Sequence, residues 1–166
     1  SMRRLQRIAL FAVLGLLGLL LGVIVVFVLL RGGTPAIRDD AGRVPVRAIA
    51  KLEWLTLGGA RQAVLLRGAN TANPVVLFLH GGPGMPTMYL AHAFQRPLEN
   101  DFVMAQWDRR GAGKSYGARV PAESLTVRRT LADLFELTQW LRARFHQDRI
   151  YLVAHSWGTY LGLVAV

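Results

Sequence analysis

An unbroken run of apolar residues near the amino terminus constrains the fold of this chain most. It covers residues 8–30, and 18 of its 23 positions are Leu, Ile, Val or Phe. As an α-helix the run would be about 34 Å long, enough to cross a hydrocarbon core of roughly 30 Å. A buried helix of a soluble protein almost never lacks polar residues over such a length. We therefore predict a membrane anchor at residues 1–31, which contacts the lipid bilayer through residues 8–30.

A cleaved signal peptide is the main alternative to a retained anchor. The apolar region of a signal peptide is usually about 7–15 residues long, and no A-x-A cleavage site follows the run, so we favour a single-pass anchor. Arg3, Arg4 and Arg7 precede the run, which favours a cytoplasmic amino terminus and an extracytoplasmic domain, although arginines on the other flank oppose this. Gly18 and Gly22 form a G-x-x-x-G pair that allows close helix contact, so a homo-oligomer stays open.

The charge balance excludes several function classes. The net charge of +10 arises from 20 Lys and Arg against 10 Asp and Glu, and residues 1–50 carry half of the excess. The remaining arginines are dispersed and no recognition motif accompanies them, so we expect no nucleic-acid partner. The chain has no cysteine, which excludes disulfides, a thiolate metal site and a cysteine nucleophile. We expect neither a metal nor a cofactor.

After a predicted linker at residues 32–50, the chain alternates strand and helix patterns. Two short runs around Gly58 and Gly59 predict a hairpin, and continuous apolar runs predict buried strands. The predicted strands cover residues 51–57, 61–67, 74–80, 102–107 and 150–154, and the predicted helices cover residues 87–98, 125–145 and the end of the chain. This alternation predicts an α/β fold, with a mostly parallel sheet and helices on both faces. Sites in such sheets form at the carboxyl ends of the strands, where three glycine-containing motifs fall.

The strongest motif is A-H-S-W-G at residues 154–158, which matches the nucleophile elbow G-x-S-x-G apart from Ala154. A serine raised on a tight strand-to-helix turn takes strained backbone angles, and small neighbours two residues away prevent collisions. The helix that follows directs its positive end at the position where an oxyanion would form. An ordinary capping serine is the alternative. We predict Ser156 as the nucleophile, supported by His155 and Gly158.

The second motif is H-G-G-P-G, at the end of the strand predicted over residues 74–80. Its members are His80, Gly81, Gly82, Pro83 and Gly84. Glycines let backbone N–H groups approach a reacting carbonyl, and the N–H of Trp157 would supply a further donor. A plain Gly/Pro turn is the alternative. We predict an oxyanion hole formed by Gly81, Gly82 and Trp157.

The third motif, W-D-R-R-G-A-G-K-S at residues 107–115, ends like a phosphate-binding loop. The pattern G-x-x-x-x-G-K-[ST] needs glycine at position 108, where Asp108 stands, and a long helix should follow it. Tyr116, Gly117 and Pro121 follow instead. We therefore reject a nucleotide site.

Together the three motifs resemble the α/β-hydrolase superfamily, most closely its proline iminopeptidase-like branch of serine hydrolases. The resemblance covers about residues 50–166, and the motifs stand in the family's order. It implies a structural loop formed by Asp108, Arg110, Gly111, Gly113 and Ser115 that braces the site. Family members often carry Gln where Arg109 stands. Residues 51–166 would be the amino-terminal part of an α/β-hydrolase domain.

The resemblance implies that the triad Asp or Glu and His lie on later strands, beyond Val166. His155 should point away from Ser156, and Asp133 and Asp148 are expected to be surface carboxylates, so no base is evident. The sequence thus predicts an incomplete fold, with either a C-terminal half or a partner missing. The leading hypothesis is a membrane-anchored serine hydrolase that cleaves an ester or amide of a small acyl or peptide substrate. The alternative is a non-catalytic, membrane-tethered binding or scaffold protein.

Overall fold

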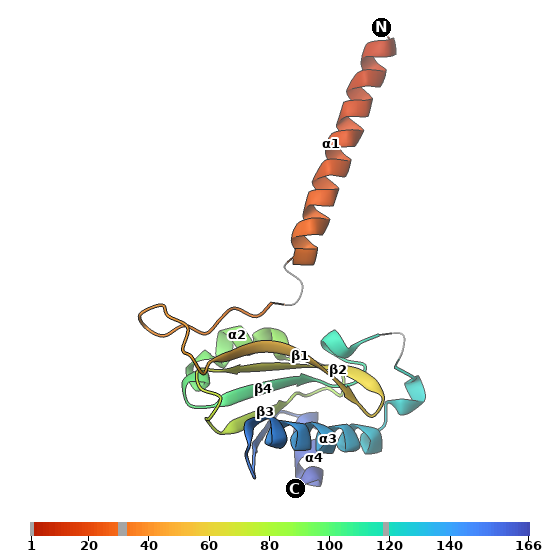
Figure 1. Cartoon of the computed structure of the whole chain (residues 1–166). Coiled ribbons are helices and arrows are strands. Elements are labelled where there is room, and N and C mark those ends of the chain that lie inside the picture. The colour runs from red at the N-terminus through yellow and green to blue at the C-terminus, as the bar shows by residue number, and fades with distance from the viewer. Residues whose placement is uncertain (1, 30–32, 118–119) are drawn as a thin grey trace. The chain divides into compact units, whose positions relative to one another are not determined.

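The computed structural model describes residues 2–29, 33–117 and 120–166, in two compact units, residues 1–33 and 34–166 (Figure 1). The first unit contains helix α1 (Met2–Leu29). Its segment Ala9–Val28 is long and apolar enough to cross a membrane, a property that a signal sequence shares. Residues 30 and 31, the end of the predicted anchor, lie outside the described residues.

The second unit is built on a five-stranded sheet. Its strands are β1 (Ile49–Leu57), β2 (Ala60–Gly68), β3 (Val75–Leu79), β4 (Val103–Asp108) and β5 (Tyr151–Ala154). They are arranged in the order β1-β2-β4-β3-β5, so β3 lies between β4 and β5. The five strands fall within one or two residues of the ranges that the apolar runs predict.

The prediction of a mostly parallel sheet is wrong, because the sheet is mixed. β3 pairs in parallel with both β4 and β5, whereas β2 pairs antiparallel with both β1 and β4. The turn at Gly58 and Gly59 reverses the chain between β1 and β2, and both glycines have positive φ angles. The parallel part is therefore restricted to the three strands that carry the motifs.

Helices cover both faces of the sheet. One face carries α3 (Val127–Phe145) and α4 (Trp157–Ala165). The opposite face carries a short segment that includes α2 (Ala91–Phe94) between the 3-10 turns Met88–Leu90 and Arg96–Asn100 (Figure 1). Two further 3-10 turns, Gly113–Ser115 and Ala122–Ser124, lie in the connection from β4 to α3.

Two predicted helices have different outcomes. The helix predicted over residues 125–145 is confirmed from Val127 onward, because Thr126 caps it: the Thr126 hydroxyl accepts a hydrogen bond from the backbone N–H of Arg129. The single helix predicted over residues 87–98 is wrong, since that segment is broken into three short turns. Pro97 lacks an N–H and disfavours a helical residue before it, so a regular helix cannot continue there.

The main core lies between the sheet and helices α3 and α4. Side chains on β3 and β4 alternate between the two faces with a period of two residues, so Leu77, Leu79 and Trp107 point into this core. They meet Leu137 and Leu141, which are fully buried on α3. This packing fixes the sheet against α3 and so positions the carboxyl ends of the strands.

Part of the predicted linker packs against the domain. Ile37 is buried, and the Arg67 guanidinium donates hydrogen bonds to the Thr34 hydroxyl and, over 2.7 Å, to the carbonyl oxygen of Pro35. The same guanidinium forms a bidentate ion pair with Glu99, at 2.6 and 3.0 Å. The second unit therefore begins at Thr34.

Asp133 is not a surface carboxylate, as the sequence suggested, but a fully buried one with 0% exposure. It accepts hydrogen bonds from Arg110 on both oxygens, at 2.5 and 2.9 Å, and from Arg129 at 3.0 Å. Gln62 donates to it over 2.8 Å and in turn accepts from the Trp107 indole N–H. This Asp133 cluster joins β2, β4 and α3, and it connects Arg110 in the loop after β4 to α3.

We expect the substitution Asp133→Asn to lower the free energy of unfolding by about 3–5 kcal/mol, because it leaves buried guanidinium charge without its carboxylate. Denaturant unfolding of the purified full-length protein in detergent measures this loss. Asp148→Asn is the matched control, since Asp148 is exposed just before β5 and should change stability little. Equal stabilities of the two variants would contradict a structural role for the Asp133 cluster.

Candidate active site

The three motifs lie together at the carboxyl ends of the parallel strands. β3, β4 and β5 run in parallel, so their carboxyl ends lie side by side. The H-G-G-P-G loop follows the central strand β3, the 109–115 loop follows β4, and the elbow follows β5. The loop after β3 therefore lies between the other two motifs and contacts both.

Ser156 occupies the strained turn that the sequence predicts. Its φ of 55° and ψ of −123° are sparsely populated by residues other than glycine, and α4 begins at the next residue, Trp157. The Ser156 side chain is exposed, and its hydroxyl makes no hydrogen bond with any residue that the structure describes. The turn thus presents a solvent-accessible hydroxyl at the amino-terminal end of a helix.

Gly158 allows this turn to lie close to β3. A Cβ atom at this position would collide with the carbonyl oxygen of Leu79 and would lie 2.7 Å from that of His80. The backbone N–H of His155 donates to the Leu79 carbonyl oxygen over 3.0 Å, which holds the two segments together. A glycine is needed here because two backbone segments approach each other directly.

The H-G-G-P-G loop of residues 80–84, called the glycine loop below, lies directly against Ser156. A Cβ atom on Gly81 would be 3.1 Å from that of Ser156, and Gly82 has a φ of +96°. Within the described residues, the backbone N–H groups of Gly81, Gly82 and Trp157 donate to no protein acceptor. The structure therefore brings the predicted nucleophile next to Gly81 and Trp157, and Gly82 follows directly in the same loop.

The loop after β4 is held by hydrogen bonds to Asp108, which is buried. The Asp108 carboxylate accepts from the backbone N–H of Lys114 over 2.8 Å, and its pKa is raised by burial, against the opposing effect of that hydrogen bond. The Ser115 hydroxyl donates to the Asp108 carbonyl oxygen and accepts from the Ala63 N–H. Gly111 and Gly113 turn the chain with positive φ angles. These contacts hold the loop to the end of β4 and to β2.

Arg109 is a residue of this site to which the sequence patterns gave no role. Its side chain is only 2% exposed. Its Nη2 atom lies 2.7, 2.8 and 3.1 Å from the carbonyl oxygens of His80, Gly81 and Pro83, and its guanidinium stacks on the Trp157 ring at 4.5 Å. The only sequence signal was the arginine at a position where the family often carries glutamine.

His80 is buried below the glycine loop and stays neutral at pH 7. Burial and the neighbouring Arg109 charge lower the pKa of His80 to about 4. Its Nδ1 atom lies 2.8 Å from Arg109 Nη2 and 2.9 Å from the carbonyl oxygen of Gly81. A protonated ring would face the guanidinium without a counter-charge, so this histidine supports the loop in its neutral form.

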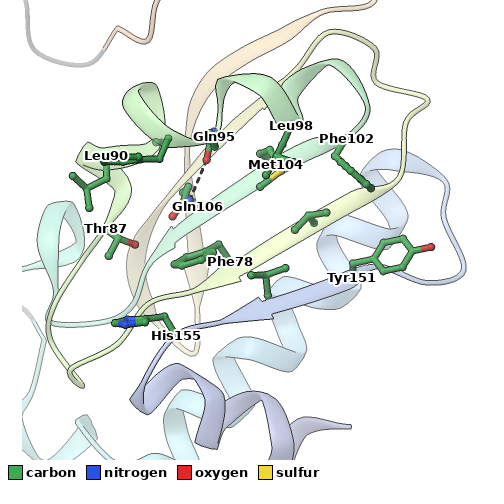
Figure 2. A pocket seen from close by; sticks show the side chains of 14 residues that line it. Phe78, Thr87, Leu90, Gln95, Leu98, Phe102, Met104, Gln106, Tyr151 and His155 are labelled. Carbon is green, nitrogen blue, oxygen red and sulfur yellow. Dashed lines mark hydrogen bonds between the residues drawn. The ribbon is translucent and has the colours of Figure 1, made fainter.

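His155 points to the opposite face of the sheet from α3 and α4. There it lies at one end of a cavity of about 720 Å³, with Tyr151 at the other end of the same strand (Figure 2). The cavity is mainly apolar, and in Figure 2 its Gln95 and Gln106 side chains hydrogen bond to each other over 3.0 Å. Ser156 is not among the residues that line this cavity.

The described part of the chain shows neither a general base hydrogen-bonded to Ser156 nor a metal cluster. No histidine or carboxylate there contacts the Ser156 hydroxyl. Within residues 2–29, 33–117 and 120–166, no group of three or more His, Asp or Glu side chains could hold a metal ion. The site as described consists of a hydroxyl, backbone donors and one buried guanidinium.

These features define an α/β-hydrolase site, and comparison with known proteins agrees. The profile of the alpha/beta hydrolase fold family matches residues 74–166, more than half of the chain, and the chain belongs to this family.

Two named proteins are similar to this chain in sequence. A probable aminopeptidase, YbaC, of Bacillus subtilis (strain 168) is 39% identical over 117 residues, which are 70% of this chain and 37% of the relative. A probable proline iminopeptidase of Leptolyngbya boryana is 31% identical over 130 residues, which are 78% of this chain and 35% of the relative. The chain thus spans little more than a third of the length of either relative.

Solved structures show the same fold. A proline iminopeptidase-related protein from Thermus thermophilus superposes with a TM-score of 0.59 at 26% identity, over 70% of this chain and 40% of that protein. An epoxide hydrolase from Vigna radiata superposes with a TM-score of 0.57, also at 26% identity, over 70% of this chain and 35% of that protein.

The close contact at Gly158 predicts that Gly158→Ala will destabilise the protein by about 1–3 kcal/mol or more, since the new methyl group meets backbone atoms that cannot move aside. Thermal unfolding of the full-length protein measures the loss. Gly162→Ala in the same helix is the control, because its nearest contacts would be ordinary, at 3.7 Å, and alanine favours a helix by roughly 0.5–1 kcal/mol. A neutral Gly158→Ala variant would disprove the close approach.

The depressed pKa of His80 predicts a pH-dependent stability. Between about pH 6.5 and 4 the unfolded chain binds a proton at His80 that the folded protein does not, so stability falls as the pH is lowered. The contribution approaches about 1.4 kcal/mol per pH unit in this window. Unfolding free energies measured from pH 4 to 7.5 should depend less on pH in His80→Gln than in the wild type. His146→Gln, at an exposed position, should keep the wild-type dependence, and unchanged behaviour of His80→Gln would refute the interpretation.

Proposed function

We propose that this protein is a serine hydrolase that cleaves an ester or amide by acyl transfer, with Ser156 as the nucleophile. The observation that carries the proposal is the strained, exposed Ser156 against the loop of residues 80–84, where no described residue accepts a hydrogen bond from the N–H of Gly81 or Gly82, or from that of Trp157. Backbone strain at an exposed polar residue is typical of functional sites, because the surrounding structure must hold the residue there.

The chemistry follows from these groups. The Ser156 oxygen attacks the substrate carbonyl carbon and forms a C–O bond, while its proton passes to a general base. The carbonyl oxygen becomes an oxyanion, which the three N–H groups stabilise by hydrogen bonds. The leaving alcohol or amine takes the proton from the base as its bond to carbon breaks. Water then attacks the acyl carbon and gives a proton to the base, and the Ser156 oxygen takes that proton back as its bond to carbon breaks and the carboxylic acid is released.

The base and its carboxylate partner are proposed to lie in the remainder of the protein. Both relatives are almost three times as long as the matched segment, which leaves room for further strands. A serine hydroxyl without a base is a weak nucleophile, so residues 1–166 alone would react slowly.

The substrate class and the location are proposals as well. The names of the two relatives favour a small peptide substrate cleaved at its amino terminus, and other small acyl compounds fit the same chemistry. The apolar segment Ala9–Val28 supports a single-pass anchor in the lipid bilayer. The arginines that precede it, Arg3, Arg4 and Arg7, favour a hydrolase domain on the extracytoplasmic side.

A fluorophosphonate probe tests the proposal, because it forms a covalent bond with an activated serine. The full-length wild-type protein in detergent should be labelled, and Ser156→Ala should abolish labelling. Labelling is read from gel fluorescence, and the labelled residue is identified by mass spectrometry of the digested protein.

The control variant is Ser124→Ala, which removes a hydroxyl bonded locally to the Pro121 carbonyl oxygen. This variant should be labelled like the wild type. A folded full-length protein that stays unlabelled would refute the serine-hydrolase proposal and favour the non-catalytic, membrane-tethered binding or scaffold protein.

A further inference from the structure

The guanidinium of Arg109 contacts the carbonyl oxygens of the two peptide groups whose N–H groups are proposed oxyanion donors. Its Nη2 atom lies 2.7 Å from the carbonyl oxygen of His80 and 2.8 Å from that of Gly81. The His80 carbonyl shares a peptide group with the N–H of Gly81, and the Gly81 carbonyl shares one with the N–H of Gly82. The guanidinium therefore binds the carbonyl ends of the same two peptide units.

The geometry of a peptide group links these contacts to the donors. In a trans peptide the C=O and N–H bonds point in opposite directions, and the described part of the chain has no cis peptide bond. Fixing the two carbonyls on the guanidinium thus turns both N–H groups away from it. A cation at the carbonyl end also polarises the peptide group, which strengthens the N–H as a donor.

The Arg109 charge has no counter-ion among the described residues. Its Nε and Nη1 atoms are buried without a hydrogen-bond partner, whereas the neighbouring Arg110 and the buried Arg67 each have a bidentate carboxylate. A buried cation without such a partner is costly. Burial accordingly lowers the pKa of Arg109 to about 10, which still leaves the side chain charged at neutral pH.

The side chain of the residue that carries the third proposed donor also contacts this charge. The Arg109 guanidinium lies 4.5 Å from the centre of the Trp157 ring, and Trp157 carries the N–H at the start of α4. One unneutralised cation therefore contacts both the peptide groups that carry two of the donors and the side chain of the residue that carries the third. A negative charge that develops at the oxyanion would be stabilised by this cation.

We propose that Arg109 is a positioning residue of the reaction, which aims and polarises the N–H groups of Gly81 and Gly82 toward the oxyanion. This role rests on the proposed function of Ser156. Arg109 acts through the glycine loop and does not touch the substrate, so it should affect the rate of the chemical step and leave substrate affinity almost unchanged.

Two substitutions separate the parts of this role. Arg109→Met fills a similar volume but removes both the charge and the donors, whereas Arg109→Gln keeps an N–H donor and removes the charge. We expect the maximal rate constant of fluorophosphonate labelling to fall about 100-fold in Arg109→Met, the effect of losing an oxyanion donor, and by less in Arg109→Gln. The probe concentration at half-maximal rate should change less than about threefold, since it reports reversible binding.

The matched control is Arg61→Met. Arg61 also stacks on a tryptophan, at 4.2 Å from the Trp54 ring, but it is exposed on β2. This variant should be labelled at the wild-type rate. The backbone amide chemical shifts of Gly81 and Gly82 give a second readout that does not depend on activity, because loss of the cation on the carbonyls in Arg109→Met should shift these two resonances and leave those of α3 unchanged.

The outcomes distinguish this inference from the proposed function. Labelling of Arg109→Met at the wild-type rate would overturn the inference while Ser156 remains the nucleophile. A rate loss matched by an equal loss of folded protein would overturn it too, since the role would then be structural. An unlabelled wild type would refute the function and, with it, the role of Arg109 in the reaction.

Discussion

The parallel pairing of β3 with two neighbours is the constraint on which the site depends. Because β4 and β5 flank β3 in the same direction, their following loops leave the sheet at one edge and within contact distance. The loop of residues 80–84 can then touch Ser156 on one side and Arg109 on the other. An antiparallel partner at either position would carry one of these loops to the opposite end of the sheet.

Two adjacent arginines show how the same side chain is used in different ways. Arg110 forms a bidentate ion pair with Asp133 and so connects the loop after β4 to α3. Arg109 binds only carbonyl oxygens, a histidine nitrogen and the face of a tryptophan among the residues that the structure describes. The first arrangement neutralises the charge and holds the framework together. The second leaves the charge without a counter-ion beside the glycine loop, where it would stabilise a developing oxyanion.

The sequence predicts local features of this fold better than it predicts tertiary ones. Apolar runs identify the strands, and the small residues around Ser156 predict a strained turn, because both signals depend on neighbours in the chain. The burial of Asp133 was missed, since its partners Arg110 and Gln62 are distant in sequence. The roles of Arg109 and of the antiparallel β2–β4 pairing likewise depend on contacts between segments that no local pattern reports.

Strain and uncompensated charge occur together at this edge of the sheet. The φ of 55° at Ser156 costs of order 1–3 kcal/mol, and a buried cation without a carboxylate costs several more. The core between β3 and α3 offsets these costs: Leu77, Leu79, Leu137 and Leu141 are all fully buried there. A framework of this kind would be more stable with a relaxed turn and a neutral side chain. Because both unfavourable features adjoin the same loop of residues 80–84, their persistence supports the proposed acyl-transfer chemistry.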